Sequence, residues 1–480
     1  MKIKHTTELG SNESSLLHLL ILSDQNRDLA VDFLKSNFNL NHSGEGLSEK
    51  GKQRVIGNGS STVITVGIGT PKNEHEAVRR AVATGVNHAN DFEFEKVQVV
   101  YFQQKPTKSN QVYTAIAEAA ILANYQFLPY KSEPQRNSLC EVQVYSPNAY
   151  DSAYLEQGEK IARAACIARD LVNEPVITLT AQEMANRCEA FGKELGFSVE
   201  VLNKARIQAL KMGGLLAVNS GSIDPPTFTI MEWKPENAWN DAPIVLVGKG
   251  VVYDTGGLSL KPTPNSMDKM KADMGGAAAV IGTICGAASL ELPVHVIGLV
   301  PATDNRPGQK AYTPGDVITM FDGSRVEVLN TDAEGRMILA DALAYAKKYN
   351  PSLVIDLATL TGAQVVAIGE HGTAMMATAP DEVRSRLKHA GERVYERLVE
   401  LPLWDEYRDQ LKSDIADLKN IGGSPAGCIT AGKFLEHFTD YPWVHLDIAG
   451  PAFLGSNDGY RLKNGTGVGV RLLLEFLANY

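Results

Sequence analysis

Cysteine is scarce in this chain: there are five residues in 480, widely spaced and without a C-x-x-C pair. An odd number at such spacing argues against a disulfide framework and a cysteine zinc site, whereas reduced thiols are typical of cytoplasmic proteins. Long hydrophobic runs are missing too. We find no signal-peptide pattern and no apolar stretch that approaches the length needed to cross a bilayer. These absences predict a cytoplasmic location and no membrane partner.

Several catalytic patterns are also absent. The chain has no H-E-x-x-H and no G-x-S-x-G, which argues against the zinc proteases and serine hydrolases that carry them. Around Lys249 the sequence G-K-G lacks the spacing and the hydroxyl of a Walker A loop, so a phosphate cradle is disfavoured. The formal net charge of −10 weakly disfavours a nucleic-acid partner, because such partners select basic surfaces.

Length and pattern predict an α/β chain of two domains. At 480 residues the chain is too long for one ordinary core. We expect a small N-terminal α/β domain over residues 1–150, a boundary in the turn-rich stretch 146–152, and a larger C-terminal α/β domain over residues 155–480. In the first domain, strand patterns (16–22, 62–67, 97–102, 140–145) alternate with helical ones (74–89, 111–123), which favours a mainly parallel sheet.

The C-terminal domain is expected to contain a central, mainly parallel mixed sheet flanked by helices. Short continuous apolar runs, typical of buried parallel strands, lie at residues 215–218, 227–233, 244–247, 294–300, 353–357 and 444–446. Helical patterns lie at residues 156–172, 181–195, 275–289, 336–349, 380–401 and 429–438.

The first of three charged motifs is I-V-L-V-G-K-G-V-V-Y-D-T-G-G, residues 244–257. A buried strand leads into Lys249 and then Asp254, which would lie on opposite faces of a regular strand. The glycines beside Lys249 allow a bulge that would bring the two side chains together. Alone, this motif favours a simple Lys249–Asp254 salt bridge, because a buried lysine needs a partner.

The second motif is Lys261 followed by M-D-K-M-K-A-D-M-G-G, residues 267–276. Asp273 lies just ahead of a helix rich in glycine and alanine, and acids are stabilised at a helix N-terminus. Taken alone, the motif therefore indicates helix capping, with Lys261 on the surface.

The third motif, V-E-V-L-N-T-D-A-E-G-R-M-I at residues 326–338, places Asp332 and Glu334 between an apolar run and a helical pattern. Acids two residues apart share a face only where the backbone is extended. A capped helix with Arg336 on its surface explains the stretch about as well. The sequence leaves open whether the helix begins at Asp332 or after Glu334.

Together the motifs point to metals. Five charged side chains fall at strand ends or in the loops that follow, where open α/β sheets bind ligands. Four carboxylates at one place repel each other unless cations intervene, and this number suits two divalent ions that share carboxylates. A lysine ligates only as the neutral amine, which adjacent divalent ions would favour. Lys261 and Arg336 stay available to stabilise an oxyanion. The predicted ligands are Lys249, Asp254, Asp273, Asp332 and Glu334.

At these motifs the sequence resembles the leucyl aminopeptidase family, also called the cytosol aminopeptidases. N-T-D-A-E-G-R at residues 330–336 is similar to the family signature, and the two other metal segments follow the family order. A-T-L-T-G-A (358–363) and H-L-D-I-A-G (445–450) match as well. The resemblance covers residues 155–480. It implies a two-metal aminopeptidase that hydrolyses N-terminal residues, leucine and similar, through a metal-activated bridging water.

The resemblance also implies a role for each predicted ligand. Lys249 and Asp273 would bind only the tighter metal, Asp332 the more exchangeable one, and Asp254 and Glu334 both. The two ions per chain would be Zn or Mn, with Mg or Co as further candidates.

The resemblance further implies catalytic and substrate-binding residues. Lys261 would polarise the scissile carbonyl, and Arg336 would hold a bicarbonate ion that acts as general base. The chain would act on peptides as a homohexamer, with an assembly or regulatory role for the N-terminal domain. The substrate site would be lined by Met270, Asn330, Thr359, Leu360, Gly362 and Ala449.

Two alternatives remain from the residues. The metals could serve a dipeptidase or a metallo-phosphatase, because Lys261 and Arg336 would also suit a phosphoryl group. A DNA-binding role would need a basic patch; the best candidate, Lys72 with Arg79 and Arg80, is interleaved with acids. We therefore expect no nucleic-acid partner.

Overall fold

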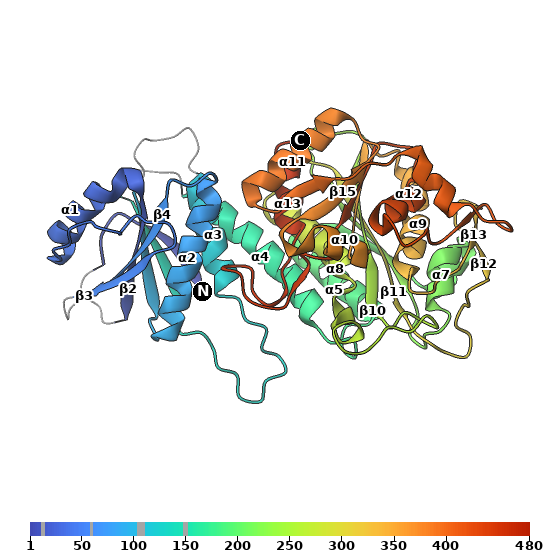
Figure 1. Cartoon of the computed structure of the whole chain (residues 1–480), viewed down its shortest axis with the longest axis horizontal. Coiled ribbons are helices and arrows are strands. Elements are labelled where there is room, and N and C mark those ends of the chain that lie inside the picture. The colour runs from blue at the N-terminus through green and yellow to red at the C-terminus, as the bar shows by residue number, and fades with distance from the viewer. Residues whose placement is uncertain (11–14, 58–60, 103–110, 147–151) are drawn as a thin grey trace. The chain divides into compact units, whose positions relative to one another are not determined.

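The computed structural model describes residues 1–10, 15–57, 61–102, 111–146 and 152–480 (Figure 1). The chain forms two compact units, one of Met1–Arg163 with Ser456–Leu462 and one of Ala164–Gly455 with Lys463–Tyr480. We call them the N-terminal and C-terminal units. Most of the boundary expected at residues 146–152 lies outside the described residues. Helix α4 (Ala153–Asn173) runs from one unit into the other.

The N-terminal unit contains a six-stranded sheet in the order β1-β6-β5-β2-β4-β3, parallel except for the edge strand β3. Helices cover both faces of this sheet, and successive side chains of β2 point to opposite faces. Leu20 packs with helix α1 on one face, and Leu19 meets Gly85 of α2 on the other. The elements are β1 (Lys2–Thr6), β2 (Leu16–Ser23), α1 (Arg27–Phe38), β3 (Gln53–Gly57), β4 (Thr62–Gly69), α2 (Glu74–Asp91), β5 (Lys96–Tyr101), α3 (Gln111–Ala123) and β6 (Glu141–Tyr145).

A short segment from late in the chain, Ser456–Leu462, completes the N-terminal unit. The hydroxyl of Tyr460 donates to Glu76 Oε2 at 2.8 Å, and Arg80 Nη1 pairs with Asp458 at 2.7 Å. Arg79 is 4% exposed and pairs with Glu118 at 2.8 Å. Two of the three basic residues considered for DNA binding are therefore held in ion pairs.

The C-terminal unit is built on a nine-stranded sheet in the order β16-β15-β18-β14-β9-β11-β8-β7, with β10 paired to β11. The four central strands β18, β14, β9 and β11 are parallel, and antiparallel pairings flank them. The expected mixed, mainly parallel sheet is confirmed. Its strands are β7 (Ser198–Leu202), β8 (Thr227–Trp233), β9 (Ile244–Gly248), β10 (Gly250–Asp254), β11 (Val296–Asn305), β14 (Leu353–Ala358), β15 (Thr373–Ala377), β16 (Leu398–Glu400) and β18 (Trp443–Asp447).

Helices cover both faces of this sheet. Val245 and Val247 of β9 join the core formed with helices α7, α9 and α12, whereas Gly248 and Gly298 point to α8. The helices are α5 (Ala181–Leu195), α6 (Lys204–Ala209), α7 (Gly213–Asn219), α8 (Gly275–Ser289), α9 (Glu334–Ala346), α10 (Gly362–Ala367), α11 (Asp381–Val394), α12 (Gly427–Glu436) and α13 (Val470–Ala478). Two smaller sheets are formed by β12 (Val317–Thr319), β13 (Arg325–Glu327) and β17 (Leu418–Lys419), and by β19 (Phe453–Leu454) with β20 (Asn464–Gly465).

Two predicted elements are wrong. Residues 215–218 were expected as a buried strand but lie in helix α7, because the Asp341 carboxylate accepts the Leu215 N–H at 2.9 Å near the helix start. The helix expected over residues 380–401 ends at Val394, where Tyr395 takes a left-handed conformation with φ 60°, and strand β16 follows.

One stretch is longer and more apolar than expected. Met267–Ser289 has the length and composition of a membrane-spanning helix, so the expectation that no apolar stretch approaches that length was wrong. Of its apolar window, 94% is buried inside the fold, as in a core helix. Its small residues explain the burial: a Cβ at Gly276 would overlap Leu357 O of β14, and Gly248 of β9 lets the backbone of Ala277 approach that strand closely.

Candidate metal centre

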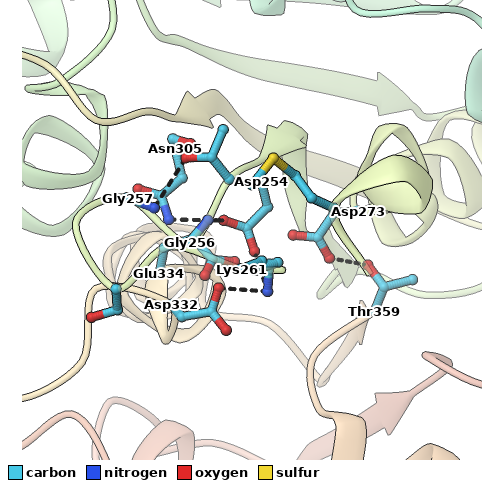
Figure 2. Close-up of polar contacts among 12 residues, drawn as sticks. Asp254, Gly256, Gly257, Lys261, Asp273, Asn305, Asp332, Glu334 and Thr359 are labelled. Carbon is cyan, nitrogen blue, oxygen red and sulfur yellow. Dashed lines mark hydrogen bonds and ion pairs between the residues drawn. The ribbon is translucent and has the colours of Figure 1, made fainter. Parts of the chain in front are cut away.

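Four of the predicted ligands, the carboxylates of Asp254, Asp273, Asp332 and Glu334, lie close together (Figure 2). Lys249, the fifth, joins them through its contacts with Asp273 and Glu334. Lys249 follows β9 and Asp254 ends β10. Asp273 follows the 3₁₀ helix η2 (Met267–Ala272) and precedes α8. Asp332 lies before α9, and Glu334 is the first residue of that helix, with Ala333 as its N-cap. The helix thus begins after Asp332 and at Glu334, and both acids point into the centre.

Glycines flank Lys249 at the end of β9 and the start of β10. A Cβ at Gly248 would lie 2.6 Å from Ala277 Cα, and one at Gly250 would lie 2.5 Å from Pro301 O. Only residues without a side chain fit such approaches. Beyond Gly248 the chain leaves β14 and pairs with β11 alone, with a register shift between Val251 and Asp254. The bulge inferred around Lys249 is therefore not found there: the register with β11 continues from Val247 to Gly250, and the irregularity lies between Val251 and Asp254.

The two lysines pair across the motifs. Lys249 Nζ lies 2.7 Å from Asp273 Oδ2 and 2.9 Å from Glu334 Oε1. Lys261 Nζ lies 2.9 Å from Asp254 Oδ2 and 2.5 Å from Asp332 Oδ1. The simple Lys249–Asp254 pair considered from the first motif alone does not occur among the ion pairs of the described residues. Four carboxylates face two ammonium groups, so negative charge is in excess.

Burial and repulsion act on the acids of this cluster. Burial chiefly, with the nearby Glu334 charge, raises the pKa of Asp254 to about 7, and burial also raises the pKa values of Asp273 and Asp332. Burial alone would raise the pKa of Glu334 too, but Lys249 and Lys261 lower it below its usual value. Without a metal, the cluster relieves its repulsion by holding protons.

The donor set fits a divalent cation. Oxygens of Asp254, Asp332 and Glu334 lie within 4.8 Å of one another. Glu334 Oε2 is buried and has no hydrogen-bond partner among the described residues, which is costly for a carboxylate that binds nothing. Glu334 also connects this group to Lys249 and Asp273 through its other oxygen. Carboxylate oxygens with a single amine suit hard or borderline divalent ions.

We predict that metal affinity falls below pH 7. Since the pKa of Asp254 in the metal-free protein is about 7, the proton bound below that pH must leave before a metal binds. Calorimetric titration of Mn²⁺ at pH 6, 7 and 8, in two buffers of different ionisation enthalpy, measures both affinity and proton release. An affinity that does not change between pH 6 and pH 8, with no proton release, would contradict the prediction.

Gly335 separates Glu334 from Arg336 and lies against Lys249. A Cβ at this position would overlap Lys249 Cε, and the amine cannot swing away freely because Asp273, Glu334 and the Thr359 carbonyl hold it. Gly335→Ala should therefore weaken Mn²⁺ binding by at least about tenfold in calorimetry, as loss of an orienting contact does. Gly455→Ala, where a Cβ meets nothing within 4 Å, is the control and should bind as the wild type does.

Arg336 is buried without an acidic partner among the ion pairs of the described residues. Its Nη1 donates to Asn420 O at 2.8 Å, and its Nε has no hydrogen-bond partner within the described chain. Burial lowers its pKa to about 10, which leaves it charged at neutral pH. The surface position that a capped helix would give Arg336 is excluded. A buried guanidinium with open donors is suited to bind an anion.

The residues predicted to line the substrate site lie in loops and short helices. Thr359 contacts the centre directly, because its hydroxyl donates to Asp273 Oδ1 at 2.9 Å (Figure 2). Asn330 Oδ1 accepts the Asp332 N–H at 2.8 Å. Met270 lies in η2, Leu360 and Gly362 follow β14, and Ala449 follows β18. Their contact with substrate stays a prediction.

Sequence reasoning missed three buried residues that position the site. Asn305, at the end of β11, donates from Nδ2 to Asp254 Oδ1 at 2.8 Å and to Thr331 O at 2.9 Å (Figure 2). Thr331 in turn donates to Gly256 O at 2.7 Å. Asn420 donates from Nδ2 to the Asn330 carbonyl at 2.7 Å. Such residues carry no spacing signature, since buried amides and hydroxyls that bond backbone occur throughout protein cores.

Comparison with known proteins identifies the sequence family. Residues 166–474 match the sequence model of the cytosol aminopeptidase family, catalytic domain, and residues 49–134 match that of the family's N-terminal domain. A probable cytosol aminopeptidase of Chloroherpeton thalassium is 54% identical over 68% of this chain and 64% of its own length. One of Roseiflexus castenholzii is 42% identical over 87% of each chain.

Solved structures of the same kind align along nearly the whole chain. A mutant of tomato leucine aminopeptidase superposes with a TM-score of 0.90 at 26% identity, over 100% of this chain and 97% of its own. The bottromycin maturation enzyme BotP in complex with Mn superposes with a TM-score of 0.85 at 32% identity, over 96% and 98%.

The fold, the carboxylate cluster and these similarities together identify the class of protein. It is a metal-dependent peptide hydrolase of the aminopeptidase class. The chain belongs to the cytosol aminopeptidase family. The resemblance inferred from its motifs is confirmed.

Proposed function

We propose that this chain removes N-terminal residues, leucine and similar ones, from peptides with the help of two divalent ions. The observation that carries the proposal is the cluster of Asp254, Asp332 and Glu334, with one Glu334 oxygen unpartnered among the described residues. Lys249 and Asp273 extend the cluster into a second group of donors. Two ions bound there would supply Lewis acidity and an activated water.

The chain's own residues have distinct tasks in this proposal. Lys261 is the more accessible lysine, with 15% of its side chain exposed against 3% for Lys249, so it can reach a substrate carbonyl oxygen. Burial alone would lower its pKa, but the surrounding carboxylates, Asp254 foremost, raise it, so the group stays cationic and can stabilise an oxyanion. Arg336 would hold a bicarbonate ion, which would supply a general base beside the substrate site.

Zn and Mn are the metals we propose first, with Mg and Co as further candidates. The manganese complex of BotP supports Mn, because that protein shares the fold at 32% identity. A cytoplasmic location, a homohexameric assembly and an assembly or regulatory role for the N-terminal unit belong to the same proposal.

The decisive test is release of 4-nitroaniline from leucyl-4-nitroanilide by purified protein stripped of metal and reloaded with Mn²⁺ or Zn²⁺. We expect turnover only after reloading, and none with the N-acetylated substrate, because an aminopeptidase needs a free amino terminus. No turnover with either metal would overturn the proposal. Hydrolysis of a phosphate ester without peptide hydrolysis would instead favour the phosphatase alternative.

A further inference from the structure

Asp447 ends strand β18 and is fully buried, yet it neither belongs to the metal cluster nor forms an ion pair among those of the described residues. Its Oδ1 accepts the backbone N–H of Leu360 at 3.1 Å and that of Ala449 at 3.2 Å. Its Oδ2 accepts the Thr361 hydroxyl at 2.6 Å and lies 3.6 Å from Cys428 Sγ. One carboxylate thus joins two loops that follow adjacent parallel strands, β14 and β18.

A second buried side chain, that of Gln364, strengthens this link. Thr361 caps helix α10, because its Oγ1 accepts the Gln364 N–H at 3.1 Å while its own proton goes to Asp447. Gln364 Oε1 accepts the Gly450 N–H at 2.6 Å, and its Nε2 donates to Gly372 O at 2.8 Å. The loop after β18 is therefore tied to the loop after β14 at two successive positions, Ala449 and Gly450.

The first of these loops touches the metal centre. Thr359 bonds Asp273 through its hydroxyl and accepts from Lys249 at 2.9 Å through its carbonyl (Figure 2). Leu360, the next residue, is held by Asp447. A buried carboxylate is costly unless it is well hydrogen-bonded, so a buried acid that bonds two loop amides favours one fixed arrangement of them.

We propose that Asp447 is a positioning residue that fixes the distance between Leu360 and Ala449, which would form two walls of the substrate site. It thereby sets the affinity for the substrate's first residue and the selection among different first residues. The inference rests on the proposed function, because it takes these walls as the place where that residue binds. Asp447 does not touch the metal ligands in any described contact, so the chemical step depends on it less than substrate binding does.

The test compares Asp447→Asn with the wild type on leucyl-, alanyl- and glycyl-4-nitroanilide. We expect KM for the leucyl substrate to rise about tenfold, kcat to change less than about threefold, and the leucyl-to-glycyl ratio of kcat/KM to fall. Bound Mn²⁺ per chain should not change. Thr361→Val should shift KM in the same direction by a smaller factor, and Thr361→Ser should restore it, because serine keeps the hydroxyl.

Asp341→Asn is the matched control. Asp341 is also a fully buried aspartate that accepts backbone N–H groups, from Leu215 and Phe321, but it lies in the interior of α9 and caps α7. A stability loss in this variant without a change in KM or selectivity is the expected result. If Asp447→Asn behaves like Asp341→Asn, Asp447 is merely structural and the inference is overturned.

Hydrogen exchange tests the link that Asp447 makes between the two loops, independently of turnover. Peptides that cover residues 359–362 and 448–451 should exchange faster in Asp447→Asn than in the wild type, and the rest of the chain should not. Unchanged exchange there would also overturn the inference. A wild type that holds Mn²⁺ but hydrolyses none of the anilides would refute the proposed function instead, which separates the two failures.

Discussion

Glu334→Gln should lower turnover of leucyl-4-nitroanilide at least about 10³-fold and remove most bound metal. The substitution keeps shape but deletes the charge that joins the two groups of donors, through Oε1 near Lys249 and the unpartnered Oε2. Divalent ions held by oxygen ligands depend on that charge. Metal content by inductively coupled plasma spectrometry and turnover on the same preparation measure both effects.

Glu396→Gln is the control for Glu334→Gln. Glu396 is also a buried glutamate, but it bonds the Gly469 N–H and Arg471 near the start of α13, away from the cluster. It should lose stability and keep its metals and its turnover per folded molecule. A Glu334→Gln protein that still holds two ions per chain would show that Glu334 is not a shared ligand.

Arg336→Ala should slow turnover about 100-fold while both metals stay bound. Its guanidinium bonds the Asn420 carbonyl and is a buried cation without an acidic partner among the described ion pairs, and its Nε has no hydrogen-bond partner there, which suits it to bind an anion. In carbon-dioxide-free buffer the wild-type rate should rise on addition of bicarbonate, and the variant rate should not.

Arg336→Lys distinguishes charge from shape at this position. Lysine keeps the positive charge but lacks the two-pronged donor geometry that matches a carboxylate-like anion, so an intermediate rate is expected. A bicarbonate response that persists unchanged in Arg336→Ala would exclude Arg336 as the site of that anion, and loss of metal in the variant would move it into the metal-binding group.

The convergence of the charged motifs could be predicted because each motif puts its acids at a strand end or in the segment that follows one, beside glycines, and strand ends in such sheets meet. Which lysine pairs with which carboxylates could not be predicted. Lys249 binds Asp273 and Glu334 from the two other motifs, and Lys261 binds Asp254 and Asp332. This arrangement depends on where the chain loses its pairing with β14 and continues beside β11 alone, which a single sequence does not record.

The errors in the fold have a common physical origin. The apolar run at residues 215–218 suits a strand or a buried helix equally, and a tertiary contact from Asp341 decides for the helix. The apolar stretch that precedes Ser289 resembles a membrane span in composition because it is buried almost completely. In both cases the deciding neighbour is more than 50 residues away in sequence or is the packed core itself.

The segment Ser456–Leu462 limits how the N-terminal unit can be transferred to another protein. The chain passes between them at three places, after Arg163, after Gly455 and after Leu462, so a fragment that stops near residue 150 is not the whole N-terminal unit. Such a fragment would leave Glu76 without the Tyr460 hydroxyl and Arg80 without Asp458. A chimera that transplants this unit onto a related catalytic unit must carry the seven-residue segment with it, although that segment is encoded close to the other end of the chain.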